Sequence, residues 1–218
     1  MMASRKPWRL FLTGCAVLRT GLAFAHPHVF VDGGVDFVMG AENSLKALHV
    51  TWRYDAFETL YILSSHGLKL NDKGELDEAS RQTLVRLRSQ FPDDFDGSAH
   101  LSVDDQLVPL KWPDDFDAHI VGDQLEVTFT RGLETPLDVT QGSINVAFYE
   151  STYFFAFSAT DTPKVLGPST CETTVVQFKA NPEDTALLET LAKLGREETS
   201  GLADVGAIFA DRIALRCG

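Results

Sequence analysis

Residues 29–54 read VFVDGGVDFVMGAENSLKALHVTWRY and carry the clearest structural pattern in the chain. Apolar side chains recur at every second position in two separate runs, which is the period of a β-strand that buries one face. Residues 40–44 lie between the runs and are rich in turn-forming types. The stretch therefore predicts two strands joined by a short turn. The apolar residues that define the strands are Val29, Val31, Val35 and Phe37, followed by Leu48, Val50, Trp52 and Tyr54.

Strand patterns resume at residue 99 and continue to residue 178, with turn-forming residues between them. Helical patterns lie on either side of this block. Antiparallel strands with helices gathered at the ends predict an α+β domain with an antiparallel, β-rich, sandwich-like core and three to four helices. No low-complexity linker divides residues 26–218, so we expect a single domain. Expected strands are 101–103, 107–112, 120–121, 125–129, 143–148, 153–157, 173–178 and 213–217. Four helices are expected: one begins at Ala56, one covers 77–89, one begins at Pro182, and one covers 202–211.

The first 25 residues have the composition of a secretory signal peptide. They contain four basic residues and no acidic one, a short apolar stretch over residues 10–18, and the small-residue pattern Ala23-Phe24-Ala25. Cleavage after Ala25 would leave His26 as the first residue of a periplasmic protein. The tetrapeptide Leu12-Thr13-Gly14-Cys15 has the form of a lipoprotein processing site, and this alternative stays open. No other segment is long and apolar enough to predict a membrane span, so the protein is not expected to be membrane-embedded.

The charge balance narrows the classes of partner. The whole chain has a formal net charge of −12, with 19 basic and 31 acidic residues. Residues 26–218 keep 15 of the basic residues and all 31 acidic ones, which gives −16. A strongly negative protein repels phosphate backbones and anionic lipids, so we expect no nucleic-acid partner and no membrane-surface partner. A metal cation is the better expectation.

Two cysteines, Cys171 and Cys217, remain beyond the predicted signal peptide. In an oxidising compartment such a pair most simply forms a disulfide, which here would pin the C-terminus to a strand. A thiol metal site or redox site would favour a closer Cys-x-x-Cys spacing. The sequence therefore predicts a structural disulfide.

The motif His26-Pro27-His28 is the main candidate for chemistry. Residues two apart in a strand point to the same face, so both imidazoles could bind one ion, next to the α-amine that cleavage would expose. Imidazole nitrogen suits zinc, nickel, cobalt and copper. Pro27 has no amide hydrogen, so the square-planar amino-terminal copper or nickel site cannot form completely. The alternative is that both histidines are exposed polar residues at a frayed terminus.

Two histidines do not complete a metal site, so further ligands must come from other elements. Asp55, in front of the predicted helix that begins at Ala56, is the first candidate carboxylate, and Glu150 is the second. Each could equally be a helix cap or a surface charge. Glu58, His49 and His66 are further possibilities, whereas His100 and His119 lack neighbours at ligand spacing and are expected on the surface. The sequence has none of the nucleophile, phosphate-loop or zinc-protease motifs that would predict an enzyme.

Four segments together resemble a known bacterial family. They are His26–Asp32 written HPHVFVD, residues 51–55 written TWRYD, residues 149–154 written YESTYF, and residues 205–210 written VGAIFA ahead of Cys217. In this order they are similar to periplasmic proteins of unknown function labelled as the periplasmic component of an uncharacterised ABC-type transport system. The resemblance implies an accessory to nickel/cobalt-type or zinc-type permeases. Members of this family often have Asp at the position of Glu150. They also often have a complete calcium-binding loop pattern at residues 69–80, where this chain lacks several of the ligand residues.

We therefore expect a non-enzymatic periplasmic protein that binds zinc, or alternatively nickel or cobalt, and passes it to an inner-membrane metal permease. His26 and His28 would be ligands, with Asp55 and Glu150 as carboxylate candidates. Two other classes stay open. One is a copper-dependent oxidative enzyme, which would need His100 or His119 as a further ligand. The other is a permease-docking module in which the histidine pair has no role.

Overall fold

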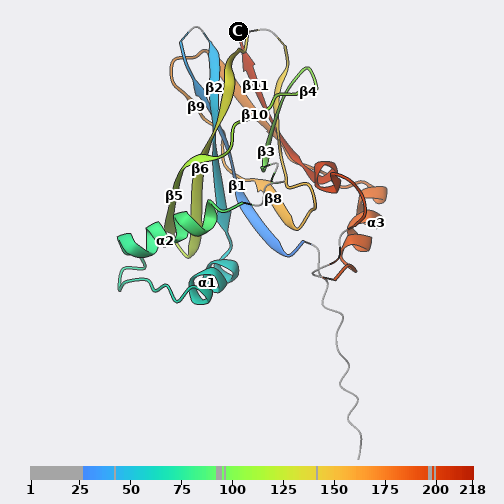
Figure 1. Cartoon of the computed structure of the whole chain (residues 1–218). Helices are drawn as coiled ribbons and strands as arrows, with labels where there is room; N and C mark the ends of the chain where they lie inside the picture. Colours follow the sequence, from blue (N-terminus) through green and yellow to red (C-terminus); the bar gives the residue numbers. More distant parts are fainter. Residues whose placement is uncertain are drawn as a thin grey trace, which may run out of the picture.

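The computed structural model describes residues 27–41, 43–91, 95, 97–140, 142–195, 198 and 200–218. The predicted signal peptide, its cleavage point and His26 lie outside these ranges. Two β-sheets pack against each other, and helices lie at the periphery (Figure 1). The first sheet has the strand order β5-β6-β2-β1-β8, and β9 also pairs with β1. Its strands are β1 (Val29–Met39), β2 (Ser44–Tyr54), β5 (Asp114–Val121), β6 (Gln124–Asp138), β8 (Phe155–Ala159) and β9 (Val165–Leu166).

The second sheet has the order β10-β11-β7-β3-β4. Its strands are β3 (Ala99–Val103), β4 (Gln106–Leu107), β7 (Ile144–Phe148), β10 (Cys171–Val176) and β11 (Asp211–Cys217). In Figure 1, α1 and α2 lie at one end of the first sheet, and α3 flanks the second sheet at its far side. The helices are α1 (Ala56–Ser65), α2 (Glu78–Arg88), α3 (Pro182–Leu191) and the 3₁₀ helix η1 (Val205–Phe209). Among the described residues, no helix has the length and apolar character that crossing a membrane requires.

The pair β1 and β2 confirms the alternation that the sequence predicts. The two strands are antiparallel, with Val31 opposite Tyr54 and Val35 opposite Val50. All eight alternating apolar residues are buried, and they join side chains of the second sheet, such as Val146 and Ile213, in one core. Burying one such side chain is worth about 1.5–3 kcal/mol, so the shared core accounts for why the two sheets pack face to face.

Three local expectations differ from the structure. Strand β8 runs parallel to β1, not antiparallel, because the chain enters the first sheet from β7 of the second sheet. Residues 107–112 form only the end of β4 and one isolated bridge at Leu110. Residues 202–211 contain the short η1 in place of a full α-helix. Helix α1 buries Thr59, Ile62 and Leu63, so the face with Phe57, Leu60 and Tyr61 is exposed.

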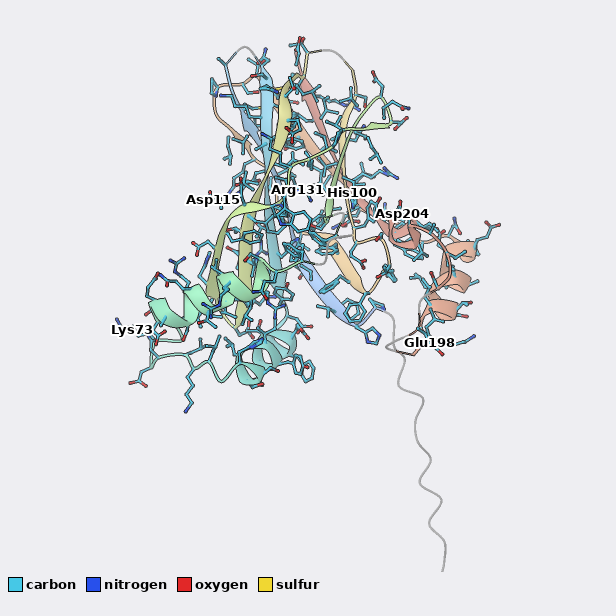
Figure 2. All side chains as sticks on the ribbon, in the orientation of Figure 1. Lys73, His100, Asp115, Arg131, Glu198 and Asp204 are labelled. Carbon is cyan, nitrogen blue, oxygen red and sulfur yellow. A yellow bond between two sulfur atoms is a disulfide. The ribbon has the colours of Figure 1, made fainter. Side chains whose placement is uncertain are left out.

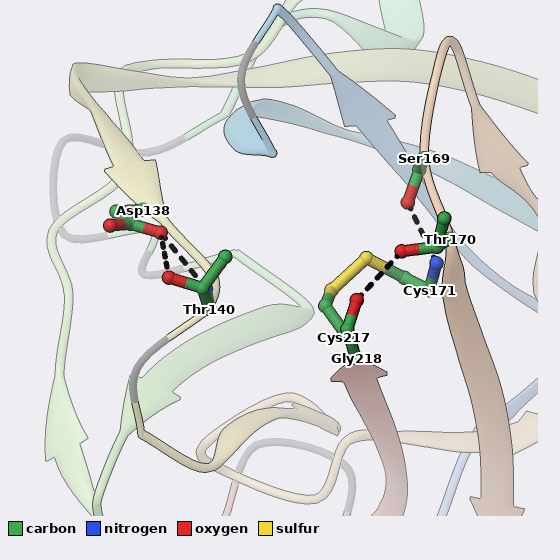
Figure 3. The surroundings of a disulfide bond; sticks show 7 residues. All are labelled: Asp138, Thr140, Ser169, Thr170, Cys171, Cys217 and Gly218. Carbon is green, nitrogen blue, oxygen red and sulfur yellow. Dashed lines mark hydrogen bonds between the residues drawn. A yellow bond between two sulfur atoms is a disulfide. The ribbon is translucent and has the colours of Figure 1, made fainter.

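The predicted disulfide between Cys171 and Cys217 is present (Figure 3). The two cysteines lie directly opposite each other on the antiparallel strands β10 and β11. Beside them, the hydroxyl of Thr170 donates to the backbone oxygen of Gly218. The covalent bond and this hydrogen bond hold the last residues of the chain against β10.

Candidate functional site

The candidate site lies at the loop that carries the chain from one sheet to the other. Residues 149–154 follow β7 in the second sheet and lead into β8 in the first; we call them the crossover loop. The carboxylate of Glu150 organises this loop from within. One oxygen accepts a hydrogen bond from the backbone N–H of Thr152 at 2.8 Å, and the other accepts from the Thr152 hydroxyl at 2.9 Å and from the Phe154 N–H at 3.0 Å. Glu150 therefore fixes the position of Phe154.

Tyr153 gives the crossover loop a strained backbone. Its φ is +60°, in the left-handed region that a bulky side chain rarely adopts. The conformation is held by the hydrogen bond from Tyr153 N–H to the Glu150 carbonyl at 3.2 Å and by the packing of its ring on Phe209, with ring centroids 4.5 Å apart. Burial raises the pKa of the Tyr153 phenol. Strain of this kind persists only where the surroundings over-determine it, and it concentrates at functional sites.

Segment η1 supports the crossover loop from behind. The N–H of Gly206 donates to the Ser151 carbonyl, and a Cβ added at Gly206 would lie 1.8 Å from the Glu150 carbonyl oxygen. Only glycine allows this approach of the two backbones. Next to it, the Tyr149 hydroxyl donates to the carboxylate of Asp204, which Figure 2 shows on the side of the molecule that carries α3.

The structure brings two of the predicted metal ligands to the same residue. The backbone N–H of His28 donates to the Phe154 carbonyl at 2.9 Å, and the imidazole packs on the Phe154 ring with centroids 4.7 Å apart. Phe154 N–H in turn donates to the Glu150 carboxylate. His28 and Glu150 thus contact opposite parts of one residue. His26, the other predicted histidine ligand, lies outside the described residues.

Asp55 has a different role in the structure. Its carboxylate caps α1 by accepting a hydrogen bond from the Glu58 N–H at 2.7 Å. Residue 55 directly follows Tyr54, the partner of Val31 in the β1–β2 register, so Asp55 lies at the same end of the sheet as His28. Within the described residues, the hydrogen bond that the Asp55 carboxylate makes is with the Glu58 N–H, and no hydrogen bond joins it to Glu150.

The remaining sequence candidates are placed elsewhere. His49 is opposite Thr130 within the first sheet, and His66 is the C-terminal cap residue of α1. His119 lies 3.0 Å from the Glu126 carboxylate. His100, expected on the surface, is partly buried and stacks on the Tyr149 ring at 3.9 Å; Figure 2 shows it near the middle of the molecule. Within the ranges that the structure describes, no group of three or more His, Cys, Asp or Glu side chains could hold a metal ion.

A cavity of about 450 Å³ adjoins the crossover loop. Glu150 and Phe154 form one wall, and the C-terminal end of α2 with Arg88 forms another. Trp52 and Tyr54, both buried, lie at its base; the Trp52 indole donates to the Ser98 hydroxyl at 2.7 Å. Burial raises the pKa of the Tyr54 phenol, and the nearby charge of Arg88 offsets part of that rise. The aromatic residues at the cavity include Trp52, Tyr54, Phe91, Phe95, Phe154 and Phe155.

Sequence reasoning missed this cavity and two residues that matter to it. The sequence assigns Arg88 to the helix expected over 77–89 but predicts no role for it, and Gly206 belongs to a segment that carries the family resemblance. The density of aromatic residues in FPDDF at 91–95 and YFFAF at 153–157 was the available signal. It could indicate an aromatic cluster, but it could not indicate that α2 would bring a guanidinium to it.

The chain belongs to a family of proteins of unknown function, DUF1007, whose model matches residues 11–217. This assignment confirms the coarser part of the resemblance seen in the sequence. The transport label and the association with a permease stay predictions. No curated protein matches the chain.

Proposed function

We propose that this member of the family is a periplasmic metal-binding protein that captures zinc, or alternatively nickel or cobalt, and passes it to an inner-membrane permease. The metal is the cargo in this proposal. His26 and His28 are its first ligands, and Glu150 is the proposed carboxylate ligand. The disulfide between Cys171 and Cys217 is compatible with a periplasmic location, because such bonds persist in oxidising compartments.

The observation that carries the proposal is the contact of both His28 and Glu150 with Phe154. An imidazole and a carboxylate beside one anchored residue are donor types that zinc accepts. The Glu150 carboxylate is already oriented by three hydrogen bonds of 3.0 Å or less, so little ordering entropy is lost when an ion approaches it. His28 and Glu150 alone do not complete a metal site, so the proposal takes a further ligand from the segment before Pro27. In that segment, His26 is the nearest donor to His28 in sequence.

Asp55 is not needed as a ligand in this arrangement. Its carboxylate satisfies an N–H group at the start of α1, which is sufficient reason for an Asp at this position. A site formed by His26, His28, the terminal α-amine and Glu150 would provide up to four donors of nitrogen and oxygen type. This number matches the tetrahedral coordination that zinc prefers.

The test is zinc binding by the secreted, processed protein. The double variant His26→Ala and His28→Ala should lose stoichiometric zinc in calorimetry and in elemental analysis. His119→Ala is the matched control, because that imidazole pairs with Glu126 on other strands and should leave zinc binding intact. Unchanged zinc content in the double variant would reject the proposal, as would equal loss in the control. The mass of the purified protein tests cleavage after Ala25 in the same sample.

A further inference from the structure

The aromatic cavity beside the crossover loop contains a cationic group with an unused donor. Arg88 ends α2, and its guanidinium lies over the Tyr54 ring, 5.6 Å from the centroid. Its Nε is buried and has no hydrogen-bond partner among the described residues. An unsatisfied buried donor costs about 1–3 kcal/mol, so a group that accepts from it would be stabilised there.

Among the described residues that line the cavity, Glu150 supplies the one carboxylate, and this carboxylate does not accept a hydrogen bond from Arg88. Glu150 turns its oxygens toward its own loop, where they accept from Thr152 and from the Phe154 N–H. No ion pair joins Glu150 to Arg88 in the described part of the chain. At the cavity, the Glu150 carboxylate therefore already has its hydrogen-bond donors, whereas the Arg88 guanidinium cation has an N–H without an acceptor. This favours an anion over a cation as the ligand.

The aromatic residues that line the cavity determine which apolar group of a ligand could fit there. Trp52, Phe91, Phe95 and Phe155 surround the space with aromatic rings, and the volume of about 450 Å³ lies within the range of small-molecule sites. Trp52 is held in place by its indole hydrogen bond to Ser98 and by edge contact with Phe91, with ring centroids 6.0 Å apart. Such walls bind flat or branched apolar groups through burial and ring contacts.

The geometry points to a binding site for a small organic carboxylate with an apolar, aromatic-sized body. The carboxylate accepts from the Arg88 guanidinium, and the body lies against Trp52 and Phe155. This site shares the wall formed by Glu150 and Phe154 with the proposed metal site, but it uses no histidine and can be measured in metal-free protein. Its failure would leave the zinc proposal standing, and the reverse also holds.

The experiment uses 3-phenylpropionate as the probe with the chelator-treated secreted protein. We expect binding in the millimolar range or tighter by calorimetry, and weaker binding of 3-phenylpropan-1-ol and 3-phenylpropylamine, which lack the acceptor anion. In nitrogen-15 spectra, the acid should shift the Arg88 Nε–H signal and the Trp52 indole signal together. Absence of binding up to about 10 mM, or tighter binding of the amine, would overturn the inference.

Two variants of α2 separate the effect of the Arg88 charge on binding from an effect on folding. Arg88→Gln should weaken the probe about tenfold or more, because a charge-assisted hydrogen bond is lost. Arg86→Gln is the matched control: Arg86 is an exposed residue of the same helix turn and does not line the cavity. Equal affinity of Arg88→Gln and the native protein for the acid would contradict the assignment. If Arg88→Gln does not fold, the Nε–H shift in the native protein decides the question.

Discussion

The two ends of strand β11 are secured in different ways. At Cys217, the strand is joined covalently to β10, and the hydroxyl of Thr170 holds the terminal residue. At Asp211, about 20 Å away along the strand, hydrogen bonds join the neighbouring segments where the other end has a covalent cross-link. The buried Asp211 carboxylate accepts from the N–H groups of Ala159 and Phe178, both at 2.7 Å. Phe148, opposite Asp211, leads directly into the crossover loop.

We call the disulfide end the structural end, and we call the end that carries the proposed binding sites the functional end. The disulfide end has regular pairing and a covalent cross-link. The crossover end combines a strained tyrosine, a glycine pressed against the Glu150 carbonyl, His28 and the aromatic cavity. Changes at the first end should affect stability alone, whereas changes at the second should affect binding as well.

Removing the disulfide should produce the largest loss of stability. For Cys171→Ser combined with Cys217→Ser, we expect the free energy of unfolding to fall by up to about 4 kcal/mol, because the cross-link restricts the unfolded chain. Urea denaturation measures this loss. Zinc and 3-phenylpropionate affinities, measured where the variant is still folded, should stay at their native values. A clear loss of either affinity would contradict the separation of the two ends.

Replacing Gly206 should produce a smaller loss of stability but a loss of binding. In Gly206→Ala, the new Cβ meets the Glu150 carbonyl at 1.8 Å, and backbone must move to relieve it. We expect a destabilisation of about 2 kcal/mol and weaker binding of both zinc and the probe, since Glu150 and Phe154 shift.

Gly195→Ala is the control for the Gly206 variant. A Cβ at Gly195 finds its nearest neighbour, the side chain of Glu198, at 3.4 Å, so thermal unfolding and both affinities should change little. Native affinities in a destabilised Gly206→Ala protein would show that the crossover loop is not the binding element.

The sequence predicted the individual strands, the disulfide and the helix caps better than it predicted the contacts that form the candidate site. Period-two patterns predicted β1 and β2, and a cysteine pair that follows a predicted signal peptide predicted the disulfide, because both signals are local or compositional. The helix caps Asp55, Asp77 and Asn181 can also be predicted from sequence, because a cap side chain accepts from N–H groups no more than three residues away.

The candidate site depended on contacts that no local pattern encodes. Phe154 meets His28 only because β8 crosses into the first sheet and pairs in parallel with β1. Arg88 reaches the aromatic cavity because α2 packs along β5, where Arg81 pairs with Asp117.

Asp55 provides the finest test of the comparison, because it lies at the functional end while the structure gives it a structural task. Asp55→Ala should cost about 1 kcal/mol of unfolding free energy through the lost cap. Asp77→Ala is the matched control: that carboxylate caps α2 through the Ser80 N–H, also at 2.7 Å, and its loss should cost a similar amount.

Asp55→Asn then separates the cap from the charge, since asparagine caps a helix about as well as aspartate. If Asp55 acts only as a cap, Asp55→Asn keeps both native stability and native zinc affinity. A fall in zinc affinity at unchanged stability would instead make Asp55 a metal ligand and would extend the site from the crossover loop to the start of α1. Calorimetric zinc titration beside urea denaturation distinguishes these outcomes, because the first measures the lost charge and the second measures the lost cap.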